Sequence, residues 1–319
     1  MKKTGLFLLL SLLLALTACG TNQPTESDNS VPDTNTETTE SISTERLTDE
    51  TEENANAERK FVLVRQTIYN AANQENSRIE FTYDDKGNEI SKLTYTSGVL
   101  MQRNDQLYDG QNRCIRSVIT DLYKETPESY IYEYEYDESG NLITERMTAT
   151  NGYLTMHRHE YDSLGRKTKT TSSGNNTTTE YSYPDEKICI IISQSDISGT
   201  PYFQQAKESY DDQGNLIQRL EYKQNSYDEI EYEHKYYYNE QGKQIKYEIF
   251  KDGEAYGETI SEYKGDQLHR VSTQMDSYLM VEDYEYDDYG NLIEKTSLLG
   301  AIAISRTVYE YREIYQSIP

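Results

Sequence analysis

A short motif recurs from residue 61 to the end of this 319-residue chain and constrains its fold more than any other feature. The best copies follow the pattern Tyr-Asp-x-x-Gly-Asn-Leu-Ile, and the last copy lacks its turn. Successive copies begin 22 to 28 residues apart. A period in this range is typical of architectures that stack one supersecondary unit. The first residues of the ten copies, here called the anchor tyrosines, are Tyr83, Tyr108, Tyr136, Tyr161, Tyr183, Tyr210, Tyr238, Tyr263, Tyr286 and Tyr311.

The residues before each anchor tyrosine alternate. Between Tyr130 and Tyr136 every second residue is Tyr, with Ile or Glu between them. A period of two places Tyr on one face of a β-strand and acidic residues on the other, whereas a helix would scatter both around its axis. The residue two before the anchor is aromatic in seven of ten copies, so this aromatic face belongs to the repeat: Phe81, Tyr134, His159, Tyr181, Tyr236, Tyr284 and Tyr309.

The Asp-x-x-Gly segment after each anchor has the composition of a hairpin turn. The Asp side chain caps backbone amides, and Gly accepts the left-handed conformation. A second, more variable turn follows the next strand, as at Asn151-Gly152 and Asp252-Gly253. The sequence therefore predicts an all-β fold, an array of about nine antiparallel β-hairpin repeats. Because sheets twist, we expect the array to form a curved or spiral sheet or shell.

Composition supports a repeat array over an ordinary globule. The chain has 31 Tyr, 5 Phe and no Trp, and only 35% of its residues are hydrophobic. A two-layer domain of this size needs more Leu, Ile and Val. We expect cross-strand aromatic pairs, worth ~0.2–1 kcal/mol each, to hold neighbouring hairpins together. The open ends of such an array need protection, which Arg312 and Glu313 in the last strand could supply.

The motif resembles the YD repeat of RHS-repeat proteins, in which Tyr-Asp-x-x-Gly is followed by a basic and an apolar residue. The segment from Tyr161 to Arg166 matches it best. The resemblance implies β-hairpins that coil into a spiral shell, often around a C-terminal toxin. Most copies here carry Asn in place of the basic residue, and the sequence ends after the last repeat. We therefore expect the fold to carry over and the toxin-delivery role not to.

The N-terminus has the pattern of an export signal. Lys2 and Lys3 precede an apolar run from Leu6 to Ala18, which is too short to cross a bilayer. The run ends in Leu-Thr-Ala-Cys-Gly, which resembles the lipobox of bacterial lipoproteins and implies lipidation of Cys19 after cleavage. The predicted organisation is a signal peptide at 1–18, a lipidated Cys and disordered acidic tether at 19–60, and a Tyr-rich β-hairpin domain at 61–319. The predicted location is the extracytoplasmic side of the cell membrane, at the cell surface or facing a periplasm.

Candidate sites for chemistry have simpler structural interpretations. His157 and His159 share a strand face, but a metal site needs a third ligand, and we expect His159 to occupy the aromatic position instead. Paired acids such as Asp84-Asp85 recur in turns, where their environments should be alike. Cys114 and Cys189 stand where other copies carry Leu, which favours small apolar roles. We expect no catalytic residue, no metal and no cofactor.

The net charge of -25 excludes nucleic acid as a partner through a basic patch. The chain is expected to be a non-catalytic lipoprotein whose repeat surface binds a carbohydrate, a cell-wall polymer or a protein. An immunity lipoprotein against a secreted toxin and a polysaccharide-acting enzyme are the alternatives. The same tyrosines could instead serve only to hold the sheet together. The candidate binding face comprises Tyr83, Tyr134, Tyr136, Tyr161, Tyr210, Tyr236, Tyr238, Tyr284, Tyr286 and Tyr309.

Overall fold

The computed structural model describes residues 57–197 and 200–317, and these residues form strands, turns and bends. The strands are β1 (Ala57–Asn70), β2 (Glu75–Tyr83), β3 (Glu89–Thr96), β4 (Val99–Tyr108), β5 (Cys114–Asp121), β6 (Glu128–Tyr136), β7 (Leu142–Ala149), β8 (Leu154–Tyr161), β9 (Lys167–Ser172), β10 (Thr177–Asp185), β11 (Ile188–Ile197), β12 (Thr200–Tyr210), β13 (Leu216–Tyr222), β14 (Ile230–Tyr238), β15 (Gln244–Lys251), β16 (Glu254–Lys264), β17 (Gln267–Met275), β18 (Tyr278–Tyr286), β19 (Leu292–Leu299) and β20 (Ile302–Ser317). Within those two stretches, no helix has the length and hydropathy needed to cross a membrane. The predicted signal peptide and Cys19 lie outside the described residues.

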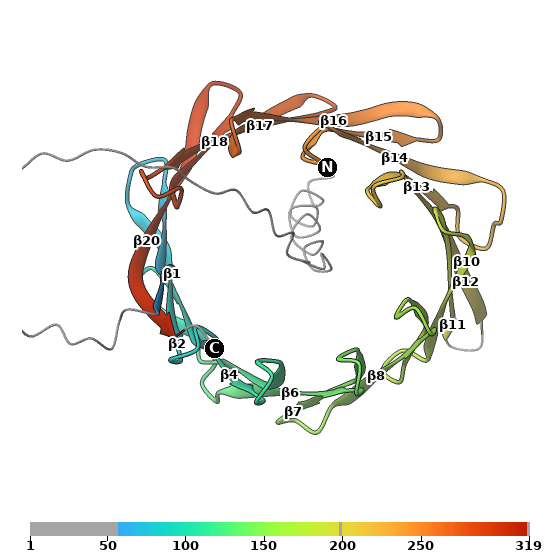
Figure 1. Cartoon of the computed structure of the whole chain (residues 1–319), viewed down its shortest axis with the longest axis horizontal. Coiled ribbons are helices and arrows are strands. Elements are labelled where there is room, and N and C mark those ends of the chain that lie inside the picture. The colour runs from blue at the N-terminus through green and yellow to red at the C-terminus, as the bar shows by residue number, and fades with distance from the viewer. Residues whose placement is uncertain (1–56, 198–199, 318–319) are drawn as a thin grey trace, which may run out of the picture. The chain divides into compact units, whose positions relative to one another are not determined.

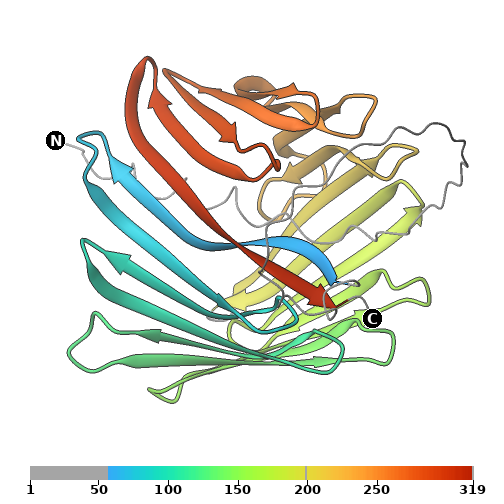
Figure 2. The same cartoon turned by 60° about the vertical axis from the view of Figure 1, so that its left-hand side comes forward.

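The strands form one closed antiparallel barrel. Each strand pairs with the next along the chain, and β1 pairs with β20 from Ala57↔Ser317 to Asn70↔Ser305. Figure 1 shows the resulting ring of strands, and Figure 2 shows them inclined between two rims of hairpin turns. The all-β, antiparallel hairpin prediction is therefore confirmed.

The expectation of a curved or spiral shell with open ends is corrected by the β1–β20 pairing. Residues before the first anchor tyrosine form a strand of their own, which supplies the partner that the last strand would otherwise lack. Arg312 and Glu313 accordingly pair with Val62 and Phe61 instead of guarding a free edge. Closure removes the edges that an open sheet would expose to other chains.

The folded unit begins slightly earlier than the sequence pattern indicated. The tether was predicted to extend to residue 60, but β1 starts at Ala57 and pairs along its whole length. The pairing with β20 orders these residues although they contain no copy of the motif. Local composition could not reveal this, because the partner strand lies at the other end of the sequence.

The two rims carry different turns. The Asp-x-x-Gly turns lie at one rim, and Figure 1 shows them curling toward the inside of the ring. The second turns of the repeats form the opposite rim, here called the second-turn rim. Because β1 runs antiparallel to β2, Ala57 lies at the same rim as the turn after Tyr83. The polypeptide therefore enters and leaves the barrel at the Asp-x-x-Gly rim.

The barrel is a single layer without a conventional core. Substantial contacts join only neighbouring strands, and in the described residues none of the largest side chains is fully buried. The buried apolar side chains of the described part are small, namely Val62, Ala149, Cys189 and Ala206. Barrels with many strands cannot fill their interior with side chains. Stability must therefore come from contacts within the sheet, as expected for a repeat array.

Candidate functional site

The Asp of each turn organises the turn around its carboxylate. Oδ1 of Asp137 accepts the backbone amide of Asn141 at 2.8 Å, and Oδ2 accepts the Asn141 side-chain amide at 2.9 Å. Gly140 has a φ of 87°, in the left-handed region that Gly tolerates. The side-chain amide of Asn141, and then its backbone amide, lower the pKa of Asp137 below its ordinary value. The turn chemistry predicted from sequence is present in the structure.

Asn and Arg are equivalent at the fifth position after the anchor. Arg113 donates from Nε to Oδ2 of Asp109 at 2.8 Å, and Arg166 does the same to Asp162 at 2.8 Å. Asn141 reaches the corresponding oxygen of Asp137 with its amide. The replacement of the basic residue by Asn in most copies therefore preserves the hydrogen bond that closes the turn.

Most anchor tyrosines tie one repeat to the preceding one. The Tyr136 hydroxyl donates to the backbone carbonyl of Cys114 at 2.8 Å, across from β6 to β5. The Arg113 guanidinium covers the Tyr136 ring at 4.7 Å from its centroid. The same phenol-to-carbonyl bond is made by Tyr83, Tyr108, Tyr161, Tyr183, Tyr238, Tyr263 and Tyr286.

The candidate binding tyrosines are thus largely engaged within the sheet. Five of the ten donate to backbone carbonyls, namely Tyr83, Tyr136, Tyr161, Tyr238 and Tyr286. Two bind an acid two residues earlier, Tyr210 to Glu208 at 2.6 Å and Tyr284 to Glu282 at 2.9 Å. Burial raises the pKa of Tyr134 to about 12, that of Tyr236 to about 12, and also that of Tyr309. A ligand-binding role for these residues stays a prediction.

The aromatic contacts differ from the expected continuous ladder. In the described residues, ring pairs gather on β14 to β16, where Tyr236 and Tyr247 lie 5.2 Å apart and His234 stacks on Tyr247 at 5.9 Å. Elsewhere the cross-strand neighbours of the tyrosines are mostly aliphatic or polar, as in the pair Tyr134↔Glu145. The recurrent link between hairpins is therefore a hydrogen bond from a phenol to a main-chain carbonyl.

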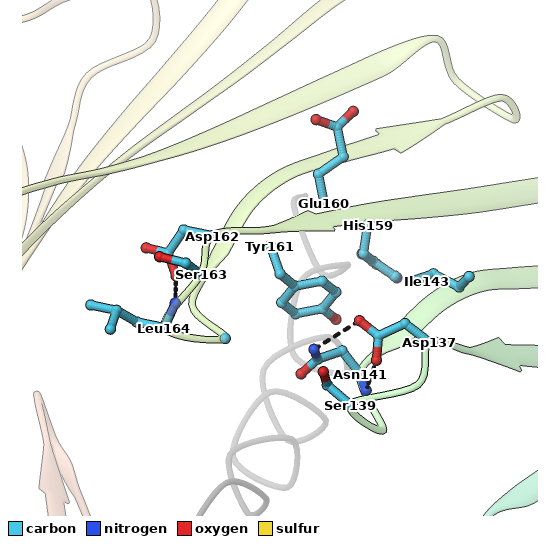
Figure 3. A pocket seen from close by; sticks show the side chains of 11 residues that line it. Asp137, Ser139, Asn141, Ile143, His159, Glu160, Tyr161, Asp162, Ser163 and Leu164 are labelled. Atoms are coloured by element: carbon cyan, nitrogen blue, oxygen red, sulfur yellow. Dashed lines mark hydrogen bonds between the residues drawn. The ribbon is translucent and has the colours of Figure 1, made fainter.

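A groove of about 560 Å³ lies between two successive Asp-x-x-Gly turns. Figure 3 shows the Tyr161 ring directed toward Asn141 and Asp137, with Glu160 on the other side of the strand. His159 also lines this groove, and its Nδ1 lies 2.9 Å from Thr170 Oγ1. Burial, with Lys167 nearby, lowers the pKa of His159 to about 4, so the imidazole is neutral. No cluster of potential metal ligands occurs in the described part of the chain.

A series of polar contacts, not indicated by the sequence pattern, crosses four strands from β12 to β15. Arg219 donates to Glu208 at 2.5 Å and to Glu221 at 2.9 Å. Nδ1 of His234 lies 2.6 Å from the Tyr247 hydroxyl, and its Nε2 lies 3.9 Å from Glu221. With the Tyr210–Glu208 bond, six residues connect from Tyr210 to Tyr247. Only the strand register reveals this chain, because its members are spread over residues 208–247.

The imidazole of His234, within this series of polar contacts, is held neutral. Burial lowers the pKa of His234, and the nearby Glu221 opposes that effect only in part. Its Nε2 is buried and has no hydrogen-bond partner. A neutral imidazole between a carboxylate and a phenol is a group that can accept or transfer a proton.

Several exposed aromatic side chains lie along the second-turn rim, whereas the exposed Tyr289 lies at the opposite rim. Tyr123, Tyr153 and Tyr227 expose 58%, 53% and 59% of their surface, and Tyr278 exposes 41%. Exposed aliphatic residues of the same rim are Val99, Leu154, Leu299 and Ile302. These residues belong to different hairpins around the barrel, so each is a separate candidate contact for a ligand that spans the rim. Sequence reasoning missed this surface because the second turns vary between copies.

Comparison with known proteins identifies no family. No family model matches the chain, and no curated protein matches it. A solved porin-like protein from Bacteroides uniformis aligns over 78% of this chain and 98% of its own, with 8% identity and a TM-score of 0.34. A likeness at this level supports no inference about function. The resemblance of the motif to YD repeats accordingly stays a prediction from the sequence.

Proposed function

We propose that this chain is a membrane-anchored extracytoplasmic lipoprotein that binds a carbohydrate polymer, such as a cell-wall glycan, without catalysing a reaction. The observation that carries the proposal is the row of exposed tyrosines on separate hairpins of the second-turn rim, namely Tyr123, Tyr153, Tyr227 and Tyr278. A Tyr side chain offers a flat apolar ring and a polar hydroxyl. That combination suits a sugar ring, which has an apolar C–H face and hydroxyls at its edge.

The direction of the chain supports this assignment. Ala57 begins at the Asp-x-x-Gly rim, so the predicted tether joins the barrel at the rim opposite the exposed tyrosines. The predicted lipid on Cys19 would anchor the chain, and the acidic segment that follows is predicted from its composition to be a self-repelling tether. In this arrangement the second-turn rim is free to meet a polymer outside the membrane.

Co-sedimentation tests the proposal. The full-length protein in mild detergent is mixed with an insoluble cell-wall preparation, and the bound fraction is measured against protein concentration. A variant with Tyr123→Ser, Tyr153→Ser and Tyr278→Ser should bind at least several-fold more weakly. Leu164→Ser is the matched control, because Leu164 is highly exposed at the opposite rim. Equal binding by the triple variant, or no binding by the wild type, would contradict the proposal.

A polysaccharide-acting enzyme is the second candidate, and the polar chain on β12 to β15 favours it. His234 is neutral, contacts Tyr247 and has an unpaired buried nitrogen. If the protein cleaves a polysaccharide, His234→Gln should abolish the release of new polysaccharide ends. The loss should occur without unfolding, which circular dichroism would check. Absence of product from the wild type on every polymer that it binds would eliminate the enzyme alternative.

A further inference from the structure

A second groove, of about 600 Å³, lies at the second-turn rim on β10, β11 and β12. Its floor is a cross-strand row in which Thr178 pairs with Gln194 and Gln194 pairs with Phe203. Phe203 precedes Tyr210 by seven residues in one strand, so the Phe203 side chain lies on the sheet face opposite the anchor tyrosine. None of the described residues that line the groove takes part in the tyrosine–carbonyl contacts between hairpins.

Phe203 lines the groove, and Tyr227 stacks on it beside the groove, in a turn that the backbone holds in place. The rings of Phe203 and Tyr227 lie 4.3 Å apart at 25°. Asn225 fixes the turn that carries Tyr227, since its Oδ1 accepts the Phe203 amide at 2.8 Å and its own amide donates to the Phe203 carbonyl at 2.9 Å. Tyr227 nevertheless exposes 59% of its surface. An aromatic surface is thus presented with little conformational freedom left to lose on binding.

The polar groups of the groove are amides and hydroxyls that carry no charge. Asn176 and Gln194 are exposed, and within the described residues their side-chain amides have no hydrogen-bond partner. Each amide offers both donors and acceptors, as sugar hydroxyls do. Among the described residues that line the groove there is no Asp, Glu, Lys or Arg, although 27% of the residues in the chain are charged. An uncharged lining in so acidic a protein disfavours an anionic ligand and fits a neutral one.

We propose that this groove is a binding subsite for a neutral oligosaccharide, with one sugar ring on the exposed surface of Tyr227 and its hydroxyls bonded to Gln194 and Asn176. The subsite rests on the proposed carbohydrate-binding function and gives it a location and a charge preference. Uronic-acid polymers and other anionic glycans bind more weakly there, because the lining supplies no cation to offset their charge.

Calorimetry with defined probes tests the subsite. The full-length protein in detergent is titrated with hexasaccharides of glucose, N-acetylglucosamine, mannose and galactose, and with hexagalacturonate as the anionic comparison. The best neutral hexasaccharide should bind, and Tyr227→Ala should weaken it by about tenfold or more, as for a central aromatic contact. Gln194→Ala should weaken it less. Tyr289→Ala is the control, because Tyr289 is an exposed tyrosine in an Asp-x-x-Gly turn at the opposite rim, outside the groove.

A gain-of-signal variant separates loss of binding from loss of folding. The chain has no Trp, so Tyr227→Trp introduces a single indole at the proposed contact. Its emission should shift on addition of the neutral sugar and stay constant with hexagalacturonate. Binding of a neutral sugar with Tyr227→Ala unaffected would overturn the subsite and leave the proposed function standing. No binding to any neutral probe, or a preference for hexagalacturonate, would also overturn the subsite. The proposed function is tested separately, because it fails only if the wild-type protein does not bind cell wall, or if the triple Tyr variant binds equally well, in the co-sedimentation assay.

Discussion

The hydrogen bond from an anchor tyrosine to the preceding strand should contribute measurably to stability. Tyr136→Phe removes the hydroxyl that donates to Cys114 at 2.8 Å and keeps the ring under Arg113. A net hydrogen bond of this kind is worth about 1 kcal/mol, and the abandoned carbonyl is half-buried. We therefore expect Tyr136→Phe to lower the free energy of unfolding by about 1 kcal/mol.

Combining equivalent sites sharpens this prediction. Tyr136, Tyr161 and Tyr238 make the same bond at 2.8 Å in different repeats. Distant sites usually add, so the triple Phe variant should lose about 3 kcal/mol. Urea unfolding followed by far-ultraviolet circular dichroism measures the change. Tyr123→Phe is the control, because Tyr123 is exposed and makes no phenol-to-carbonyl bond in the described structure.

A clear result would refute the reasoning. If the triple Phe variant unfolds at the same urea concentration as Tyr123→Phe, the phenol-to-carbonyl bonds do not stabilise the barrel. Unequal losses at the three sites would show that the repeats differ in local environment. A loss much larger than about 3 kcal/mol would show that closure makes the repeats cooperative, since their effects would then no longer be additive.

Four further predictions concern other parts of the chain. Asp137 and its counterparts have pKa values lowered in the fold, so their stabilising contribution is present above about pH 4 and is lost as the pH falls through the folded pKa; a melting temperature that is constant or rises from about pH 5 to about pH 2.5 would contradict this. Burial raises the pKa of Tyr134 to about 12, so the neutral phenol stabilises the fold below about pH 10, and this stabilisation is lost as the pH rises toward the folded pKa. Absorbance at about 295 nm should resolve a class of phenols that titrates late. A single class of phenols with the ordinary pKa would refute this prediction. Arg219→Met leaves Glu208 and Glu221 without their shared partner and should lower the free energy of unfolding by about 1–3 kcal/mol, less than for a fully buried ion pair because solvent reaches these groups. An unchanged midpoint of urea unfolding would refute this prediction. Cys19→Ser should leave the protein without acyl groups and free of the membrane, as mass spectrometry and fractionation would show, and unchanged retention would contradict the anchor.

Local features of the fold were predictable because each repeat is specified by its own residues. The alternation before Tyr136 indicated a strand, and Asp137 with Gly140 indicated the turn that the structure contains. The assignment of Cys114 and Cys189 to the Leu position was also consistent with the structure, where both are free thiols and Cys189 is buried. Signals of this kind need only a few consecutive residues.

Closure was not predictable, because it depends on residues at opposite ends of the chain. Nothing near Ala57 identifies Ser317 as its partner, and β1 has no copy of the motif. The chain from Tyr210 to Tyr247 and the groove at Phe203 likewise depend on the registers of several strands. The recurrence of the tyrosines was visible in the sequence, but many of their hydroxyls reach main-chain carbonyls, which no side-chain pattern can reveal.

Trapping the β1–β20 seam by a disulfide tests the closed barrel most directly. Arg65 and Glu310 are paired in register, and their side chains form an ion pair at 3.2 Å although 245 residues separate them. Directly opposed antiparallel residues have Cα atoms about 4.5–5.5 Å apart, within disulfide range. With Arg65→Cys and Glu310→Cys, mild oxidation should join the two peptides within one monomer, as mass spectrometry after proteolysis would show, whereas Arg65→Cys with Glu285→Cys should not cross-link. Failure of the Arg65–Glu310 pair to cross-link in folded monomers, or equal cross-linking by the control pair, would contradict the closed barrel.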